Sequence, residues 1–212
     1  MNFAAPPSLD DSYPLCLNFL NVTDELFGIS PPKPSDIATF LNWVKTSDVA
    51  PSHVVEEIRA SAHPDELQAL FVEARELATW FRRLLEDFRG KRLPVIGAES
   101  LVPLNRILER DVRILQITSR DDIEDRIAGS GLKSLTKRVW RSSSMLLVPI
   151  ADDIARLLCE KDFRAISKCE ATDCGAYFIS EVVSDIPRPL GLHLCRKHAA
   201  TQPAICKAVS WI

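Results

Sequence analysis

The chain has 212 residues, enough for one large domain or for a main domain with a small appendage. Its 46% apolar and 26% charged residues exclude an intrinsically disordered protein, and the net charge of −3 gives no overall electrostatic footprint for nucleic acid. No apolar run approaches the ~20 residues of a membrane helix. The N-terminus lacks the basic and apolar regions of a secretory signal, so we expect a cytoplasmic protein with no membrane partner. Its six cysteines are then expected to be reduced thiols or metal ligands.

We expect an α+β fold in which a mainly helical domain with a few strands, residues 1–164, precedes a small C-terminal domain, residues 165–212. Apolar runs and their periods locate the elements of the first domain, and the proline-rich segment 29–34 predicts a loop. In chain order the expected elements are a strand at 14–22, helices at 35–45, 52–61, 64–90 and 98–108, strands at 111–119 and 134–141, and a helix at 144–159 kinked at Pro149.

The segment 64–90 carries the clearest helical signal. Pro64 is a favoured first helical residue and Gly90 is a natural C-terminal stop. The apolar residues between them recur at a 3–4 spacing, so one face of the helix is expected to be core. A coiled-coil partner helix is the alternative, but three phenylalanines in the segment favour a globular interior.

The C-terminal segment carries a metal-ligand pattern. Cys169 and Cys174 form one close pair, and Cys195 and His198 form a second pair after 20 intervening residues. Zn²⁺ prefers four thiolate or imidazole ligands in a tetrahedron, and close pairs separated by a finger-sized loop are typical of structural zinc sites. We therefore expect a Cys₃His site whose bound Zn²⁺ supplies the folding energy that so short a segment lacks.

Other interpretations of these residues remain open. His193 and Cys206 are within chain reach, so either could replace His198 as the fourth ligand. The cysteines could also be unrelated small buried residues, although three of the six fall inside the pattern. An enzyme is not expected, because four protein ligands close a zinc site and the chain has no Gly-x-Ser-x-Gly, His-Glu-x-x-His or phosphate-loop motif. A three-cysteine site that kept a water on the metal would revive the enzymatic alternative.

A close cysteine pair, a hairpin and a ligand-bearing helix together predict a treble-clef-like zinc finger. Gly175 directly follows Cys174, where the chain must turn sharply. The residues expected to supply strands and a miniature core for the finger are Tyr177, Phe178, Val182 and Val183.

Four segments, taken in order along the chain, match the pattern of one known bacterial family. Residues 15–22, LCLNFLNV, are similar to that family's LCLDFVNT segment, and residues 35–43, SDIATFLNW, to the helix that follows it. Residues 74–77, AREL, resemble a Leu-Arg-Glu-Ala helix, and residues 169–178 resemble a Cys-x₄-Cys-Gly-Trp-Leu-Phe block. The chain thus resembles, over most of its length, proteins that join an N-terminal ABATE domain to a CGNR-type zinc finger.

The end of the finger departs from the family pattern, which closes with Cys-Ser-Met-x-x-Cys-Gly-Asn-Arg. Cys195 matches the first of these cysteines, but Ala200 occupies the position of the second, and the Gly-Asn-Arg is missing. His198 is expected to replace the missing ligand. The loop before Cys195 is also longer, and it lacks the arginine-rich run that family members carry there.

The resemblance implies a stress-responsive transcription regulator, whose N-terminal domain senses an unidentified small ligand and whose finger binds DNA. Asn18 and Asn21 would hydrogen-bond the ligand, and the alternative is that their amides are satisfied within the fold. The segment 165–212 carries five basic and four acidic residues, so its non-specific DNA affinity should be low. The basic residues that would meet phosphates, with a merely solvated surface as the alternative, are Arg188, Arg196, Lys197 and Lys207.

A second function class is a protein-interaction or sensor module whose finger is purely structural, which the missing basic run would allow. Zn²⁺ is the cofactor expected in both cases. A symmetric homodimer is an open alternative, because small fingers commonly gain DNA affinity by pairing. The adjacent carboxylates Asp121–Asp122 and Asp152–Asp153 are expected to face solvent rather than to act in catalysis.

Overall fold

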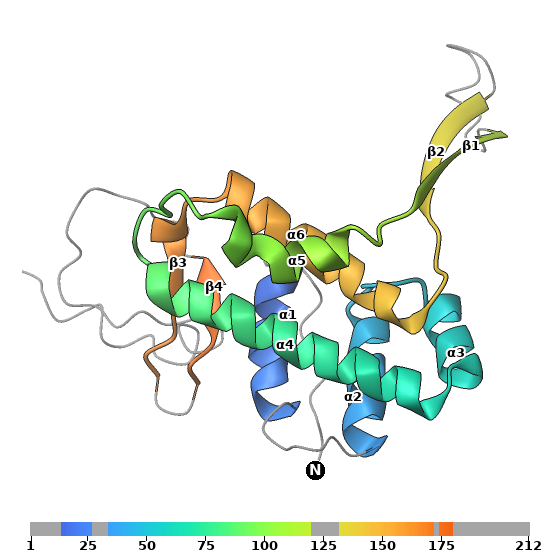
Figure 1. The fold of residues 1–212 in the computed structure, drawn as a ribbon, viewed down its shortest axis with the longest axis horizontal. Coiled ribbons are helices and arrows are strands. Elements are labelled where there is room, and N and C mark those ends of the chain that lie inside the picture. Colours follow the sequence, from blue (N-terminus) through green and yellow to red (C-terminus); the bar gives the residue numbers. More distant parts are fainter. Residues whose placement is uncertain (1–13, 27–33, 120–131, 172–173, 180–212) are drawn as a thin grey trace, which may run out of the picture.

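The computed structural model describes residues 14–26, 34–119, 132–171 and 174–179 (Figure 1). Within these ranges helices dominate, and the strands form two separate two-stranded antiparallel sheets. The predicted α+β class, mainly helical with a few strands, is therefore confirmed for this part of the chain. The segment 180–212, which would complete the predicted zinc finger, lies outside the described residues.

The first described element is a helix, α1 (Leu15–Leu26), so the predicted strand at 14–22 is wrong. A short apolar run does not by itself distinguish a strand from a buried helix, because both place apolar side chains in succession. The polar positions 18 and 21, which interrupt the run, are half-buried in the helix. The buried side chains that follow the i, i+3, i+4, i+7 spacing of one helix face are Cys16, Phe19, Leu20 and Thr23.

Three predicted helices are confirmed with ends within two residues of those expected. They are α2 (Pro34–Thr46), α3 (Ser52–Ser61) and α4 (Pro64–Phe88). Each begins at or directly after a proline, which is tolerated in the first turn because the first amide groups have no intrahelical acceptor.

The ends and the core face of α4 follow from its sequence. His63 Nδ1 accepts a hydrogen bond from the Asp65 N–H at 3.3 Å, and Pro64 opens the first turn. The helix ends just before Gly90, whose φ of +72° is open to glycine but costly for other residues. The predicted core face is confirmed, with the buried residues Leu70, Phe71, Ala74, Leu77, Ala78, Phe81, Leu84 and Leu85.

The predicted helices at 98–108 and 144–159 are each divided into a 3₁₀ turn and an α-helix. The predicted kink within the later helix is wrong, because Pro149 lies in the first turn of the α-helical part, where its missing N–H is tolerated. The four segments are η1 (Ala98–Leu101), α5 (Val102–Leu108), η3 (Ser143–Leu147) and α6 (Val148–Glu160).

The strands form two hairpins. β1 (Arg113–Ser119) pairs with β2 (Leu132–Arg138), which confirms the two strands predicted there, and this pair projects from the helices as an arm (Figure 1). Beyond α6, the turn η4 (Phe163–Ala165) leads into β3 (Ile166–Lys168), which pairs with β4 (Tyr177–Ile179). We call β1–β2 the arm, and residues 166–171 and 174–179 the knuckle hairpin.

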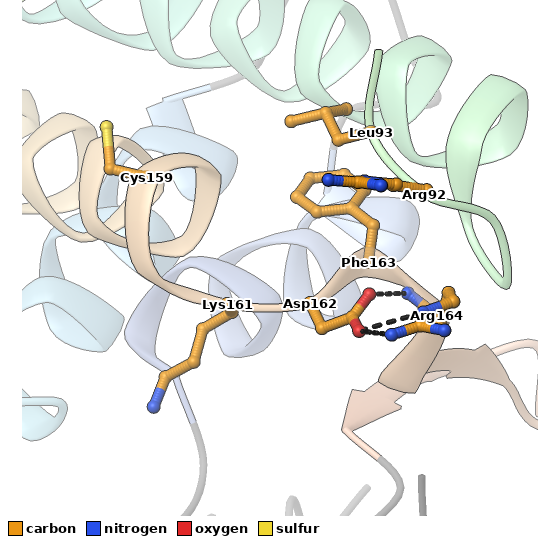
Figure 2. Close-up of a pocket in the computed structure, with 7 residues that line it drawn as sticks. All are labelled: Arg92, Leu93, Cys159, Lys161, Asp162, Phe163 and Arg164. Atoms are coloured by element: carbon orange, nitrogen blue, oxygen red, sulfur yellow. Dashed lines mark hydrogen bonds and ion pairs between the residues drawn. The ribbon is translucent and has the colours of Figure 1, made fainter. Parts of the chain in front are cut away.

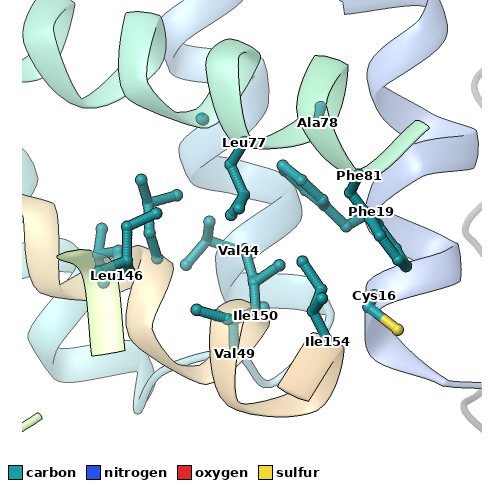
Figure 3. Packing of buried hydrophobic residues seen from close by; sticks show 14 of the residues in the cluster. Cys16, Phe19, Val44, Val49, Leu77, Ala78, Phe81, Leu146, Ile150 and Ile154 are labelled. Atoms are coloured by element: carbon teal, nitrogen blue, oxygen red, sulfur yellow. The ribbon is translucent and has the colours of Figure 1, made fainter. Parts of the chain in front are cut away.

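The core lies where α1, α2, α4 and α6 meet, and Figure 3 shows side chains from all four helices converging there. Phe19 of α1 lies against Trp43 of α2, with ring centroids 5.7 Å apart. Phe40 of α2 packs edge-on against Phe71 of α4 at 6.1 Å, a geometry that aromatic quadrupoles favour. We call this four-helix assembly the helical body.

Candidate zinc knuckle and its docking on the helical body

Cys169 and Cys174 lie at the turn between β3 and β4. The Cys169 N–H donates to the Ala176 carbonyl oxygen at 2.8 Å, and the Cys174 N–H donates to that of Ala171 at 3.1 Å. Gly175 has a φ of +58°, a conformation that other residues adopt only with strain, so the predicted sharp turn is confirmed. The two cysteines are therefore held on one tight turn.

The two thiols are chemically suited to bind a soft divalent metal. Cys169 is buried and Cys174 is half-buried. A pair of thiolates on one turn supplies two of the four ligands of a tetrahedral zinc site. Within the described ranges no group of three or more His, Cys, Asp or Glu side chains could hold a metal. Zn²⁺ bound at this turn would thus take its other ligands from the rest of the chain.

The remaining site residues of the finger lie outside the described residues, and their roles stay predictions. They are the metal-ligand candidates Cys195, His198, His193 and Cys206, and the DNA-contact candidates Arg188, Arg196, Lys197 and Lys207.

Tyr177 of β4 belongs to the core of the helical body. Its side chain is fully buried, and Ile166 of β3 is buried in the same cluster. The expectation that Tyr177 would help to form a miniature core of the finger is therefore wrong. The physical reason is size, since two strands of three residues cannot cover an aromatic ring and the helices beside them can.

Asn21 of α1 is joined to the backbone of Tyr177 by two hydrogen bonds. The Asn21 Nδ2 donates to the Tyr177 carbonyl oxygen at 3.0 Å, and the Tyr177 N–H donates to the Asn21 Oδ1 at 2.8 Å. The side-chain amide thereby satisfies both backbone groups of one strand residue, as a neighbouring strand would. The Asn21 amide is thus hydrogen-bonded within the fold, which was the alternative to ligand binding. Ligand binding by Asn18 and Asn21 stays a prediction.

Glu86, in the last turn of α4, receives hydrogen bonds from the knuckle hairpin and from Arg89, the residue directly after the helix. Lys168 Nζ donates to Glu86 Oε1 at 2.7 Å, Arg89 Nε donates to Oε2 at 3.1 Å, and the Tyr177 hydroxyl also donates to Oε1. Burial raises the pKa of Glu86, but the hydrogen bonds from Lys168, Tyr177 and Arg89 outweigh burial and lower this pKa to about 2. At neutral pH the carboxylate is ionised and ties the hairpin to α4.

Asp152 and Asp153 are both half-buried and paired, so the expectation that they face solvent is wrong. Asp153 Oδ2 accepts a hydrogen bond from the Cys16 N–H at 2.8 Å. Its negative charge thus lies at the N-terminus of α1, where the helix dipole is positive and stabilises it. Asp152 Oδ2 lies 3.3 Å from an Arg113 nitrogen and 3.4 Å from one of Arg156.

The Cys16 thiol is not activated as a nucleophile. Burial, and then the Asp153 charge, raise the pKa of this thiol well above its usual value, which disfavours the nucleophilic thiolate.

An open depression of about 580 Å³ lies where the loop after α4 meets the link between α6 and β3 (Figure 2). Within it, Asp162 Oδ2 pairs with an Arg164 guanidinium nitrogen at 2.6 Å. Figure 2 shows Lys161 and Cys159 directed away from this ion pair. The cations that line the depression therefore do not converge on one point, and the depression carries no defined binding chemistry.

The fold and the site define a class of protein: a helical body to which a hairpin with a cysteine pair is docked. Residues 14–161, more than half of the chain, match the model of the ABATE family, which is described as "Putative stress-induced transcription regulator". The chain belongs to the ABATE family, as the resemblance implied. The match ends before the knuckle hairpin begins, so it bears on the helical body and the arm and not on the predicted zinc finger.

No curated protein and no solved structure matches the chain. In the described part of the structure, none of the helices combines the length and the apolar character that crossing a membrane requires.

The low pKa of Glu86 predicts a pH dependence of hairpin docking. A carboxylate whose pKa is lowered in the folded state adds stability that is present above its unfolded pKa, about 4.3, and is lost as pH falls toward about 2. Glu86→Gln should therefore lower the free energy of unfolding at neutral pH, and the difference from wild type should shrink between about pH 4.5 and pH 2.

Urea unfolding at a series of pH values measures this difference. The matched control is Glu76→Gln, which changes an exposed carboxylate on the same helix. The control should track the wild type at every pH. A Glu86→Gln penalty that stays constant down to pH 2 would show that the ionised carboxylate is not what holds the hairpin.

Proposed function

We propose that this protein is a transcription regulator whose helical body senses a small ligand and whose C-terminal zinc finger, anchored on that body, contacts DNA. The observation that carries this proposal is the docking of the knuckle hairpin. Tyr177 lies in the core of the body, and Cys174, three residues earlier, lies on the turn that would hold the metal. Membership of the ABATE family supports the regulatory role of the body.

The proposed metal is Zn²⁺, bound by Cys169 and Cys174 from the knuckle hairpin together with Cys195 and His198. His193 and Cys206 remain the alternatives for the fourth ligand. Four protein ligands would close the site, so the metal would hold the finger together and perform no catalysis. The proposed contacts to DNA phosphates come from basic residues of the same segment, namely Arg188, Arg196, Lys197 and Lys207.

Signals from the body would reach the finger through two helices. Asn21 connects α1 to the Tyr177 backbone, and Glu86 connects α4 to the Tyr177 hydroxyl and to Lys168. A ligand that bound one arrangement of α1 and α4 more tightly than another would thus displace the hairpin and its cysteines. Regulation by ligand then needs no direct contact between the ligand and the finger.

One buried group supports a ligand site in the body. The Trp43 Nε1–H is buried, and no described residue provides it with an acceptor. A buried donor without an acceptor costs about 1–3 kcal/mol, so a polar atom of a ligand would stabilise the body by meeting it. The proposed ligand would then lie beside the α1–α2 contact, where Phe19 and Trp43 pack together.

A second candidate function is a protein-interaction module in which the finger is only structural. The observation that favours it is the arm, whose strands expose large aliphatic side chains to solvent. The two functions differ in whether the finger binds DNA.

We predict that the purified protein holds about one Zn²⁺ per chain, since four ligands make one site. Cys174→Ser should lose this metal, because three ligands bind Zn²⁺ far more weakly than four. Elemental analysis after dialysis measures the metal content. The matched control is Cys159→Ser, which removes an exposed thiol at the end of α6 and should keep the zinc. Equal zinc content in the two variants would refute the assignment.

We predict that the zinc-loaded protein binds duplex DNA in a salt-dependent manner. In the Arg196→Ala/Lys197→Ala variant, the slope of log affinity against log salt concentration should fall by about 2, because two phosphate contacts are lost. Fluorescence anisotropy between about 50 and 200 mM salt measures this slope. The matched control is Lys91→Ala/Arg92→Ala, which removes two adjacent exposed cations from the loop after α4. A wild type that binds no DNA at low salt would favour the interaction module instead.

A further inference from the structure

The arm exposes more aliphatic surface than any other described part of the chain. Five of the seven large hydrophobic residues that are exposed in the described ranges lie on its two strands. Their exposed fractions are 42% for Ile114, 69% for Leu115, 65% for Ile117, 54% for Leu132 and 41% for Leu135. Contiguous apolar surface of this kind usually marks an interaction site, whereas single exposed aliphatic residues need no explanation.

The strand register divides these residues between two faces with different charge. Directly paired residues of antiparallel strands lie on the same face, and successive residues alternate between faces. The pairs Leu115↔Thr136, Ile117↔Ser134 and Ser119↔Leu132 thus lie on one face, with the pair Arg113↔Arg138 at its base. Beyond this base pair the face contains no ionisable group, and we call that part the uncharged face. The other face contains the pairs Ile114↔Lys137, Gln116↔Leu135 and Thr118↔Lys133, and we call it the lysine face. The three most exposed aliphatic residues of the arm, Leu115, Ile117 and Leu132, all belong to the uncharged face.

An ionic network fixes the arm to the body at its base. Arg138 Nε donates to Asp111 Oδ1 at 2.6 Å, and Arg113 Nε donates to Asp111 Oδ2 at 2.7 Å. Asp152 of α6 lies 3.3 Å from Arg113. The two arginines form the pair at the base of the uncharged face, and the two carboxylates neutralise them. Figure 1 shows the arm standing clear of the helices, so its faces are not covered by the helical body.

We propose that the uncharged face of the arm is a self-association surface, on which the arm of a second copy of this chain packs about a two-fold axis. A two-stranded hairpin is marginally stable alone and gains stability when its apolar face is covered. An uncharged face is compatible with an identical face, as a two-fold interface requires, and brings no like charges together. The lysine face would place Lys133 and Lys137 opposite the same cations of the second copy, and it would be the face to attract an anionic partner. This inference does not depend on the proposed DNA binding.

The size of the face sets the strength of the association. Two paired strands of seven residues present a surface of roughly 24 by 10 Å per copy. This area is well below the ~800 Å² that each partner buries in a standard protein interface. The dimer is therefore weak, and its population depends on protein concentration.

Sedimentation velocity on the full zinc-loaded chain, from about 5 to 500 µM, tests the proposal in the weak-affinity range that this area implies. The average mass of the wild type should rise with concentration from that of one chain, 23.7 kDa, toward twice that value. Leu115→Thr/Ile117→Thr, on the uncharged face, should weaken dimerisation by at least about tenfold. Threonine is β-branched and favours strands, so the arm should still form.

The matched control is Ile114→Thr/Leu135→Thr, which makes the same kind of change on the lysine face and should alter the dimerisation constant by less than about twofold. Hydrogen exchange of the strand amides verifies that the arm is intact in both variants. A wild type that stays monomeric at every concentration would overturn the proposal. Equal weakening in both variants with the arm intact would also overturn it, because association would then not select one face.

Discussion

The burial of Tyr177 is the constraint on which the arrangement of the candidate site depends. Its ring lies in the core of the helical body, its backbone is joined to Asn21, and its hydroxyl donates to Glu86. Removing the ring from the core would expose aromatic surface and leave an ionised carboxylate with fewer donors, and both changes cost free energy. The turn that carries Cys169 and Cys174 is therefore held against α1 and α4.

Charged residues fix the two hairpins at opposite ends of the helical body (Figure 1). At the knuckle hairpin, the Glu86 carboxylate pairs with Lys168. At the base of the arm, hydrogen bonds from Arg138 and then Arg113 outweigh burial and lower the pKa of Asp111 to about 2. Metal chemistry and self-association would thus occupy separate ends, so two copies joined through their arms could each present a finger. Many transcription regulators bind DNA as dimers in this way, with one DNA-binding element for each of two half-sites.

The sequence predicted elements that are marked by a long periodic pattern or by a single residue with a local preference. It did not predict contacts between residues far apart in the chain. The helix α4 was predictable because its apolar spacing persists over 25 residues, and the turn at Gly175 because glycine tolerates positive φ. The segment of α1 was predicted as a strand because its apolar run is short. A kink was predicted at Pro149 because a proline can bend a helix as well as begin one. The pairing of Asn21 with Tyr177 joins residues 156 positions apart, which no local pattern can indicate. The cysteine pair was visible in the sequence, whereas its docking on the body was not.

If docking on the helical body positions the cysteine pair for metal binding, Asn21→Ala should change the affinity of the protein for Zn²⁺. Loss of the two hydrogen bonds to Tyr177 should loosen the hairpin and weaken zinc binding by about tenfold, because coupling between two sites is reciprocal. A competition titration against a zinc chelator measures the affinity, with Asn18→Ala on the same helix as the control. An Asn21→Ala variant that is folded and binds Zn²⁺ as tightly as Asn18→Ala and wild type would show that docking on α1 does not position the cysteines.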